Sequence, residues 1–455
     1  MAAIDDVLKY LTTNEIKWVD LQFFGIDGTM HRTTISKNDL EESTFTKGIS
    51  GADLSEVYGK SEQGELVLLP DPDTIARVPW EQSTVRLICD VIAIPSGEKF
   101  LKNPRYMLER METNLSALGI KNALIGTEVE FYIFENITTD RTSVGRGAGT
   151  ILDSRESYWS PSPMAGKKSG AYTASPVDSL YPARIQIANA LEEGFGMEVV
   201  AHHHGRSQTS QQCMEFRERN PKNAADALST LKQVTKNLTL VANAISCFMP
   251  MPVEGEKGST LSIHQSMWKT GEANAFYDSS DEYAQLSQTA RYYIGGLLEH
   301  APALCIFTNP TTNSYKRLAA DPKVLGWSKS DRTAAVQVPF KKKNDKEGKR
   351  VAYTLSDPSV NPYLAYAAVI AAGIDGIKSK IDCGDPLEQG EKKKKPKDVP
   401  DSLKAAVGAL ENDSKFLKGV FSAEILGDYL NLKLAEHRES MKTVPAWEMN
   451  KYFNV

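Results

Sequence analysis

The segment SDPSVNPYLAYAAVIAAGIDGIKSKID, residues 356–382, contains the longest apolar stretch of the chain. Its apolar part, AYAAVIAAGI at 365–374, is too short to span a bilayer as a helix. The first ten residues, MAAIDDVLKY, also lack the apolar region of a signal peptide. These two observations predict a cytoplasmic protein that does not interact with a membrane.

The composition indicates a globular protein with more than one domain. The 455 residues are many for a single domain, and a hydrophobic fraction of 41% supplies material for a buried core. The net charge of −5 is small for this length, so it does not favour nucleic acid as a partner. The five cysteines include no CxxC pair, which indicates free thiols in a reducing compartment. The charge run EKKKKPK at 391–397 predicts a solvated loop.

The first hundred residues differ in pattern from the rest of the chain. IKWVDLQFFGIDGTMHRTTI at 16–35 has strand-like runs on both sides of an Asp-Gly turn, which predicts a hairpin. KNPRYMLERMETNLSALG at 102–119 has helical periodicity and ends in glycine, which predicts a domain junction near residue 103. Beyond it, strand-like and helical patterns alternate, as is typical of an α/β or α+β domain built on a sheet.

Several segments together resemble the type I glutamine synthetase family. They are GTEVEFYIFE at 126–135, AHHH at 201–204, NPTTNSYKRL at 309–318 and the segment 356–382. The resemblance implies an α+β fold with an N-terminal β-grasp domain at 1–103 and a large catalytic α/β domain at 104–455. It also implies a ring-type homo-oligomer such as a dodecamer, with active sites between adjacent subunits.

The resemblance implies a reaction in nitrogen metabolism. The family uses ATP to phosphorylate the γ-carboxylate of glutamate, and ammonia then displaces the phosphate. Two divalent cations, of which magnesium is typical, neutralise the phosphates and the developing charge. Hard cations of this kind need a group of carboxylate ligands. ATP and magnesium are therefore expected cofactors if the family activity is retained.

Only two of the family's six metal-ligand positions carry a carboxylate here. Glu128 and Glu130 match the paired metal glutamates, and residues two apart on a strand point to the same face. At the remaining four positions the family's ligands are replaced, by Gly205, Cys213, Ser262 and Ala352.

The substrate positions are partly retained. Arg317 and Arg332 stand where the family binds glutamate and phosphate, so we expect a small anionic substrate. Asp321 is the only acid in a shortened flap that carries a catalytic glutamate in the family. For the nucleotide, the resemblance implies contacts at His264 and Ser259.

The replacements themselves suggest a different metal site. The period of two places His203 on the same strand face as Gly205, with His202 and His204 on the other, and places His264 on the same face as Ser262. The expected ligand set consists of Glu128, Glu130, His203, Cys213 and His264. Imidazole, thiolate and carboxylate together favour a transition metal such as zinc, iron, cobalt or copper over magnesium.

Three functions remain open at this point. The first is a repurposed enzyme that acts on a small anionic substrate with a transition metal. The second is a non-catalytic oligomeric protein that keeps only the fold. The third is an ATP-dependent γ-glutamyl ligase in which Glu215 or Asp321 compensates for lost ligands, although Glu215 is two residues away from the family position.

Overall fold

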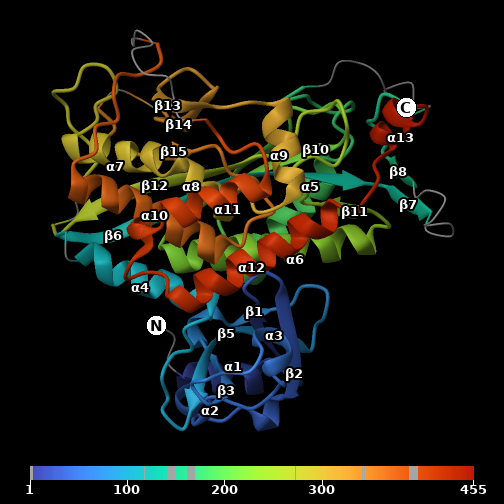
Figure 1. The fold of residues 1–455 in the computed structure, drawn as a ribbon. Helices are drawn as coiled ribbons and strands as arrows, with labels where there is room; N and C mark the ends of the chain where they lie inside the picture. The colour runs from blue at the N-terminus through green and yellow to red at the C-terminus, as the bar shows by residue number, and fades with distance from the viewer. Residues whose placement is uncertain are drawn as a thin grey trace.

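The computed structural model describes residues 4–116, 118–140, 149–160, 170–271, 273–340, 342, 344–388 and 398–455. The run 391–397, predicted to be a loop, lies outside these residues. No helix in the described ranges is both long and apolar enough to cross a membrane. The N-terminal part forms a small unit below a larger one (Figure 1).

The N-terminal unit is a five-stranded sheet with short helices. Its strand order is β2-β1-β5-β3, with β4 paired to β5. Its elements are α1 (Ile4–Thr13), β1 (Trp18–Phe24), β2 (Met30–Ser36), α2 (Thr44–Lys47), α3 (Ser55–Tyr58), β3 (Glu65–Pro70), β4 (Ala76–Arg77) and β5 (Thr84–Ile94). The antiparallel pairing of β1 with β2 confirms the predicted hairpin.

The larger unit is built on an eight-stranded sheet in the order β13-β14-β15-β12-β6-β10-β9, with β11 paired to β6. Its strands are β6 (Ile120–Phe134), β9 (Val199–His204), β10 (Gln211–Arg219), β11 (Ile245–Cys247), β12 (Leu261–Lys269), β13 (Val324–Ser328), β14 (Ala334–Gln337) and β15 (Val351–Tyr353). A separate ribbon pairs β7 (Asn136–Asp140) with β8 (Gly149–Asp153).

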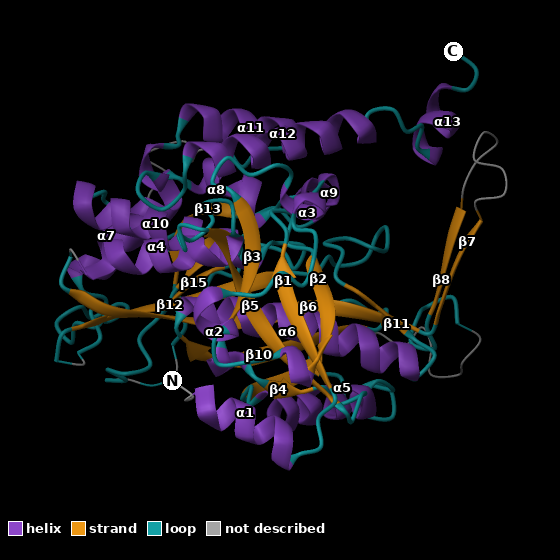
Figure 2. Cartoon of the chain, turned by 90° about the horizontal axis from the view of Figure 1, so that it is seen from below, coloured by secondary structure: helices purple, strands orange, loops and turns teal. Residues whose placement is uncertain are grey.

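Helices cover one face of this sheet, and α6 runs beneath it in Figure 1. They are α4 (Pro104–Ser116), α5 (Tyr181–Asn189), α6 (Pro221–Val241), α7 (Gln288–Glu299), α8 (Ala301–Thr308), α9 (Thr312–Ala320), α10 (Pro362–Ser379), α11 (Leu403–Asn412) and α12 (Ala423–Ser440). The last helix, α13 (Ala446–Tyr452), buries no residue and lies apart from this layer (Figure 2). Helix α4 begins directly after the boundary predicted at residue 103.

The segment 356–382 forms the central helix α10 of the core. Asn361 caps its first turn by accepting a hydrogen bond from the Tyr363 backbone N–H, and Pro362 follows at the position where a helix tolerates proline. A Cβ at Gly373 would lie only 2.0 Å from the ring of Tyr293 in α7. The small residues in AYAAVIAAGI therefore let α7 and α10 pack closely, and the apolar stretch is a core helix.

A buried cluster of charges joins the two units around Arg105, at the start of α4. Its guanidinium lies 2.7 Å from Asp71 and 3.0 Å from Asp90, both in the N-terminal unit, and 3.0 Å from Asp226 of α6. Tyr363 of α10 donates a hydrogen bond of 2.7 Å to the same Asp226. Because the Arg105 side chain is fully buried, it must stay paired, and this requirement fixes the two units against each other.

The charges in this cluster make stability depend on pH. Burial alone raises the pKa of Asp71, but Arg105 and Lys222 outweigh burial and lower this pKa to about 2. A carboxyl whose pKa is lowered by folding stabilises the folded state above its unfolded pKa. The contribution of Asp71 is therefore complete at neutral pH and is lost as the pH falls from about 4 towards 2.

We predict that Arg105→Ala strongly destabilises the protein. The substitution leaves Asp90 and Asp226 buried without their cation and leaves Asp71 with Lys222 alone, which costs about 3–5 kcal/mol in comparable cases. Urea unfolding followed by circular dichroism measures the change. The matched control is Arg217→Ala, because Arg217 forms an exposed ion pair with Glu198 and should hardly change the midpoint. An Arg105→Ala midpoint equal to that of the control would contradict the role of the cluster.

Candidate active site

A cavity of about 790 Å³ lies on the face of the large sheet that is opposite to α6 and α10. Alternation along the strands explains its floor. On β6, Val129 and Phe131 belong to the core that also contains residues of α6 and α10, whereas Glu128 and Glu130 point the other way and line the cavity. The sheet residues of the cavity are Glu128, Glu130, His203, Glu215, Ser262, His264, Gln337 and Ala352.

The strand register sets which side chains are neighbours. Cys213 of β10 lies opposite Glu130 of β6 and opposite His203 of β9. Glu215 lies opposite Glu128, and directly opposite residues of paired strands share a face. Glu215 therefore reaches the cavity through ordinary strand alternation, although it is two residues away from the family's ligand position.

Glu130 is held by protein groups on both of its oxygens. Oε2 accepts hydrogen bonds from the backbone N–H and the hydroxyl of Thr260, at 2.8 and 2.7 Å. Oε1 lies 3.3 Å from the guanidinium of Arg206, which also contacts Asp321 at 3.5 Å. Arg206 comes from the turn between β9 and β10. A guanidinium thus lies between two carboxylates on a site that the family resemblance assigns to metal binding.

Glu128 has a different environment. Its Oε2 lies 3.7 Å from Nε2 of His264, and its Oε1 lies 3.6 Å from Sγ of Cys213. The imidazole of His264 lowers the pKa of the Glu128 carboxyl, so Glu128 is an anion at neutral pH. Burial raises the pKa of the Cys213 thiol. Glu128 is therefore the carboxylate of the cavity floor that contacts an imidazole and a thiol instead of a guanidinium.

The histidine run has the predicted alternation. His203 lines the cavity, whereas the side chain of His202 lies 3.4 Å from Arg184 and that of His204 lies 3.3 Å from Glu156. Only His203 of the three is available to a ligand in the cavity.

The other sequence candidates lie at different depths. Arg332 lines the cavity, but Arg317 is completely buried and donates a hydrogen bond to the backbone oxygen of Leu355. Ser259 is also completely buried and receives a hydrogen bond from Gln211. Asp321 reaches the cavity indirectly, through its contact with Arg206. The structure therefore brings Arg332 and His264 to the cavity, and places Arg317, Ser259 and Asp321 behind its wall.

Cationic side chains outnumber carboxylates around the cavity. Three carboxylates face it, from Glu128, Glu130 and Glu215. Five cationic side chains face it, from Arg206, Lys323, Lys329, Arg332 and Arg350. Burial, assisted by the charge of Arg206, lowers the pKa of Lys323 to about 8. This excess of positive charge suits anionic ligands such as carboxylates and phosphates.

Sequence reasoning missed most of these cations. Arg350 directly precedes β15 and binds Glu215 at 3.1 Å, and its place two residues before Ala352 could have revealed it by alternation. Arg206 and Lys323 lie in turns, where no period applies, so no sequence signal marks them.

The residues present suit one divalent cation better than two. Hard cations need several oxygen ligands. Glu128 and Glu215 lie opposite each other on paired strands and can supply them, although Oε1 of Glu215 is paired with Arg350. Both oxygens of Glu130, in contrast, are already held by Thr260 and Arg206. At the family's other ligand positions, Ser262 and Ala352 have no carboxylate, and Gly205 has no space for a side chain because a Cβ would lie 2.6 Å from Gln211.

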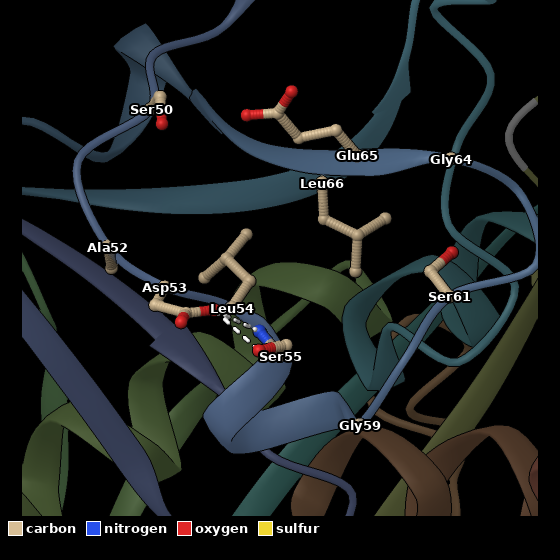
Figure 3. Close-up of a pocket in the computed structure, with 10 residues that line it drawn as sticks. All are labelled: Ser50, Ala52, Asp53, Leu54, Ser55, Gly59, Ser61, Gly64, Glu65 and Leu66. Carbon is tan, nitrogen blue, oxygen red and sulfur yellow. Dashed lines mark hydrogen bonds between the residues drawn. The ribbon is translucent and has the colours of Figure 1, made fainter.

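A second hollow, of about 540 Å³, lies in the N-terminal unit. Figure 3 shows its lining residues, which include Ala52, Asp53, Leu54 and Ser55 of the loop GADLSE at 51–56. Asp53 accepts hydrogen bonds from the backbone N–H and the hydroxyl of Ser55, so its carboxylate is held within its own loop. This hollow is formed within the N-terminal unit and shares no lining residue with the cavity on the large sheet.

Two family models match nearly the whole chain. The glutamine synthetase β-grasp domain matches residues 15–94, and the glutamine synthetase catalytic domain matches residues 101–452. The α+β fold expected from the sequence is thereby confirmed.

Curated relatives are similar over the same extent. A glutamine synthetase of Sulfolobus acidocaldarius is 40% identical over 95% of this chain and 94% of its own length. A glutamine synthetase of Microchaete diplosiphon is 34% identical over the full length of both chains. Among solved structures, glutamine synthetase of Plasmodium falciparum has a TM-score of 0.89 at 24% identity, covering 99% of each chain, which supports the fold.

These relatives overturn the interpretation of a repurposed enzyme or a non-catalytic protein. That interpretation counted ligand losses position by position, and it is wrong because relatives 31–40% identical over nearly their whole length are named glutamine synthetase. The physical reason lies in the cavity, which is lined by Arg206, a charge that the sequence did not mark, and by Glu215, which was expected only as a compensating ligand. The chain belongs to the glutamine synthetase family.

Proposed function

We propose that this protein is an ATP-dependent ligase that joins ammonia to the γ-carboxylate of glutamate. The observation that carries the proposal is the cavity itself, in which five cationic side chains surround three carboxylates on one sheet face. Glutamate and ATP are both anions, and phosphoryl transfer depends mainly on positioning and on neutralising negative charge. The names of the curated relatives support the same reaction.

Individual side chains have distinct tasks in this proposal. Arg332 and Lys323 lie on the cavity wall and bind the carboxylate or phosphate groups of the substrates. Arg206 is fixed by Glu130 and Asp321, so its charge is in place before the substrates arrive. A preorganised charge of this kind stabilises a transition state without having to be reoriented.

One divalent cation completes the charge balance. Glu128 and Glu215 would hold it, with His264 beside Glu128, and when bound it would neutralise phosphate charge. Arg206 takes over the neutralising task beside Glu130, where the chain lacks the ligands for a second ion.

We predict that the purified protein forms glutamine from glutamate, ammonium and ATP, and that Glu128→Gln lowers kcat about 100-fold or more. The substitution keeps the size of the side chain but removes the anion, and losing one such electrostatic group typically costs a factor of this order. Glutamine is measured by chromatography and phosphate release by a coupled assay. Glu198→Gln is the matched control, because Glu198 is exposed and pairs only at the surface. No glutamine from the unaltered protein under any divalent cation would contradict the proposal.

We further propose that the protein assembles as a homo-oligomer. Helix α13 extends away from the other helices (Figures 1 and 2). The segment after Met441 exposes large apolar side chains, and they are Val444, Trp447, Met449, Tyr452, Phe453 and Val455. Apolar surface of this extent favours burial against another copy of the chain. The family forms rings, which supports this assignment.

If the apolar segment holds the oligomer together, deleting residues 444–455 lowers the number of chains per particle in solution. Multi-angle light scattering compares the shortened and full-length proteins at equal concentration. The substitution Lys442→Glu is the control, because it changes charge next to the apolar segment without removing apolar surface. A full-length protein that runs as a monomer would disprove the proposal.

A further inference from the structure

Three side chains on neighbouring strands of the cavity floor form a cluster of metal-binding groups. They are Glu128 of β6, His203 of β9 and Cys213 of β10, and their ligand atoms all lie within 4.8 Å of one another. The register accounts for the cluster, since Cys213 is directly opposite His203 on β9, and Glu128 lies on the same face of β6 as Glu130, the residue opposite Cys213. The pairing of β6, β9 and β10 therefore holds the three side chains together without a bound ion.

The spacing of these atoms is close to that of a tetrahedral site. Zinc binds sulfur at about 2.3 Å and nitrogen or oxygen at about 2.0–2.2 Å, so two ligand atoms on one ion lie roughly 3.5 Å apart. Sγ of Cys213 already lies 3.6 Å from Oε1 of Glu128. The other distances between ligand atoms of Glu128, His203 and Cys213 are no longer than 4.8 Å.

His264 provides an independent observation that points to a ligand. It is only 5% exposed, and neither of its ring nitrogens has a hydrogen-bond partner in the described structure. Its Nε2 lies 3.7 Å from the free oxygen of Glu128, and its side chain faces the cavity. A buried imidazole without partners carries a desolvation cost that an ion would offset.

His203 is also oriented for an ion. Its Nδ1 lies 2.8 Å from the backbone oxygen of His204, and a carbonyl oxygen only accepts, so Nδ1 carries the proton. Nε2 is therefore the nitrogen with a free lone pair. A metal-bound histidine is usually oriented in this way, by donating its other N–H to a carbonyl or carboxylate. Tyr172 packs against the ring at a centroid distance of 4.3 Å and restricts its rotation.

We propose that Glu128, His203, Cys213 and His264 bind one divalent transition metal ion of the zinc class. One thiolate, two imidazoles and one carboxylate form a donor set that suits zinc or cobalt(II) and does not suit magnesium, which needs oxygen ligands. The cysteine sulfur loses its proton to solvent when the metal–sulfur bond forms. The inference rests on the proposed ligase and names the class of its ion, with His203 and Cys213 as ligands in place of Glu215, which pairs with Arg350. The binding itself does not require the reaction.

Cobalt(II) is the probe that tests this site, because a thiolate bound to cobalt gives a charge-transfer absorption in the near ultraviolet. Untagged full-length protein is stripped with a chelator under reducing conditions and titrated without nucleotide or glutamate. We expect one cobalt per chain, the thiolate band, and loss of the band when zinc is added. Cys213→Ser should abolish the band and weaken cobalt binding about 100-fold. His264→Asn should weaken binding at least about 10-fold and keep the band.

Cys247→Ser is the matched control, since Cys247 is a free, partly buried cysteine on β11 that lies outside the cluster. It should leave cobalt binding and the band unchanged. Absence of the band in the unaltered protein, or its persistence in Cys213→Ser, would overturn the inference. Glutamine synthesis without a cobalt band would reject this site and leave the ligase in place. A cobalt band without glutamine synthesis would support this site and reject the ligase.

Discussion

The antiparallel register of β6 with β10 and β12 is the constraint on which the site depends. Because side chains alternate, a shift of one residue would move Glu128 and Glu130 into the core and the apolar side chains between them into the cavity. The apolar face of β6 packs on the core helices, so the register cannot slip without exposing that core. The same strand register therefore both stabilises the sheet and places the charged groups in the cavity.

Fixed arginine side chains balance clustered carboxylates at two places in this protein. Arg105 lies fully buried among three aspartates and holds the N-terminal unit against α4 and α6. Arg206 plays a similar part in the cavity, between Glu130 and Asp321. In both places a guanidinium balances several carboxylates in a fixed geometry, which suits its planar set of donors. The cavity thereby keeps a net positive lining while requiring fewer bound ions.

The sequence predicted the fold and part of the site. Several segments, 356–382 among them, together pointed to the family, and alternation correctly placed the glutamates of β6 and His203 on one face. Residue identity alone could not show burial, so Arg317 was expected at the substrate although it lies inside the wall. Turn residues follow no period, which is why Arg206 was missed. The loss of function inferred from substituted ligands was wrong for that reason, since it ignored charges contributed from outside the matched positions.

In the proposed ligase, Arg206 serves as a built-in cation in a site that holds one metal ion. The most direct test is glutamine synthesis by Arg206→Gln and Arg206→Lys at saturating substrates and metal. We expect Arg206→Gln to lower kcat about 100-fold. We expect Arg206→Lys to restore part of this kcat, because lysine keeps the charge but not the planar geometry. Equal kcat values for Arg206→Gln and the unaltered protein would contradict this role of Arg206.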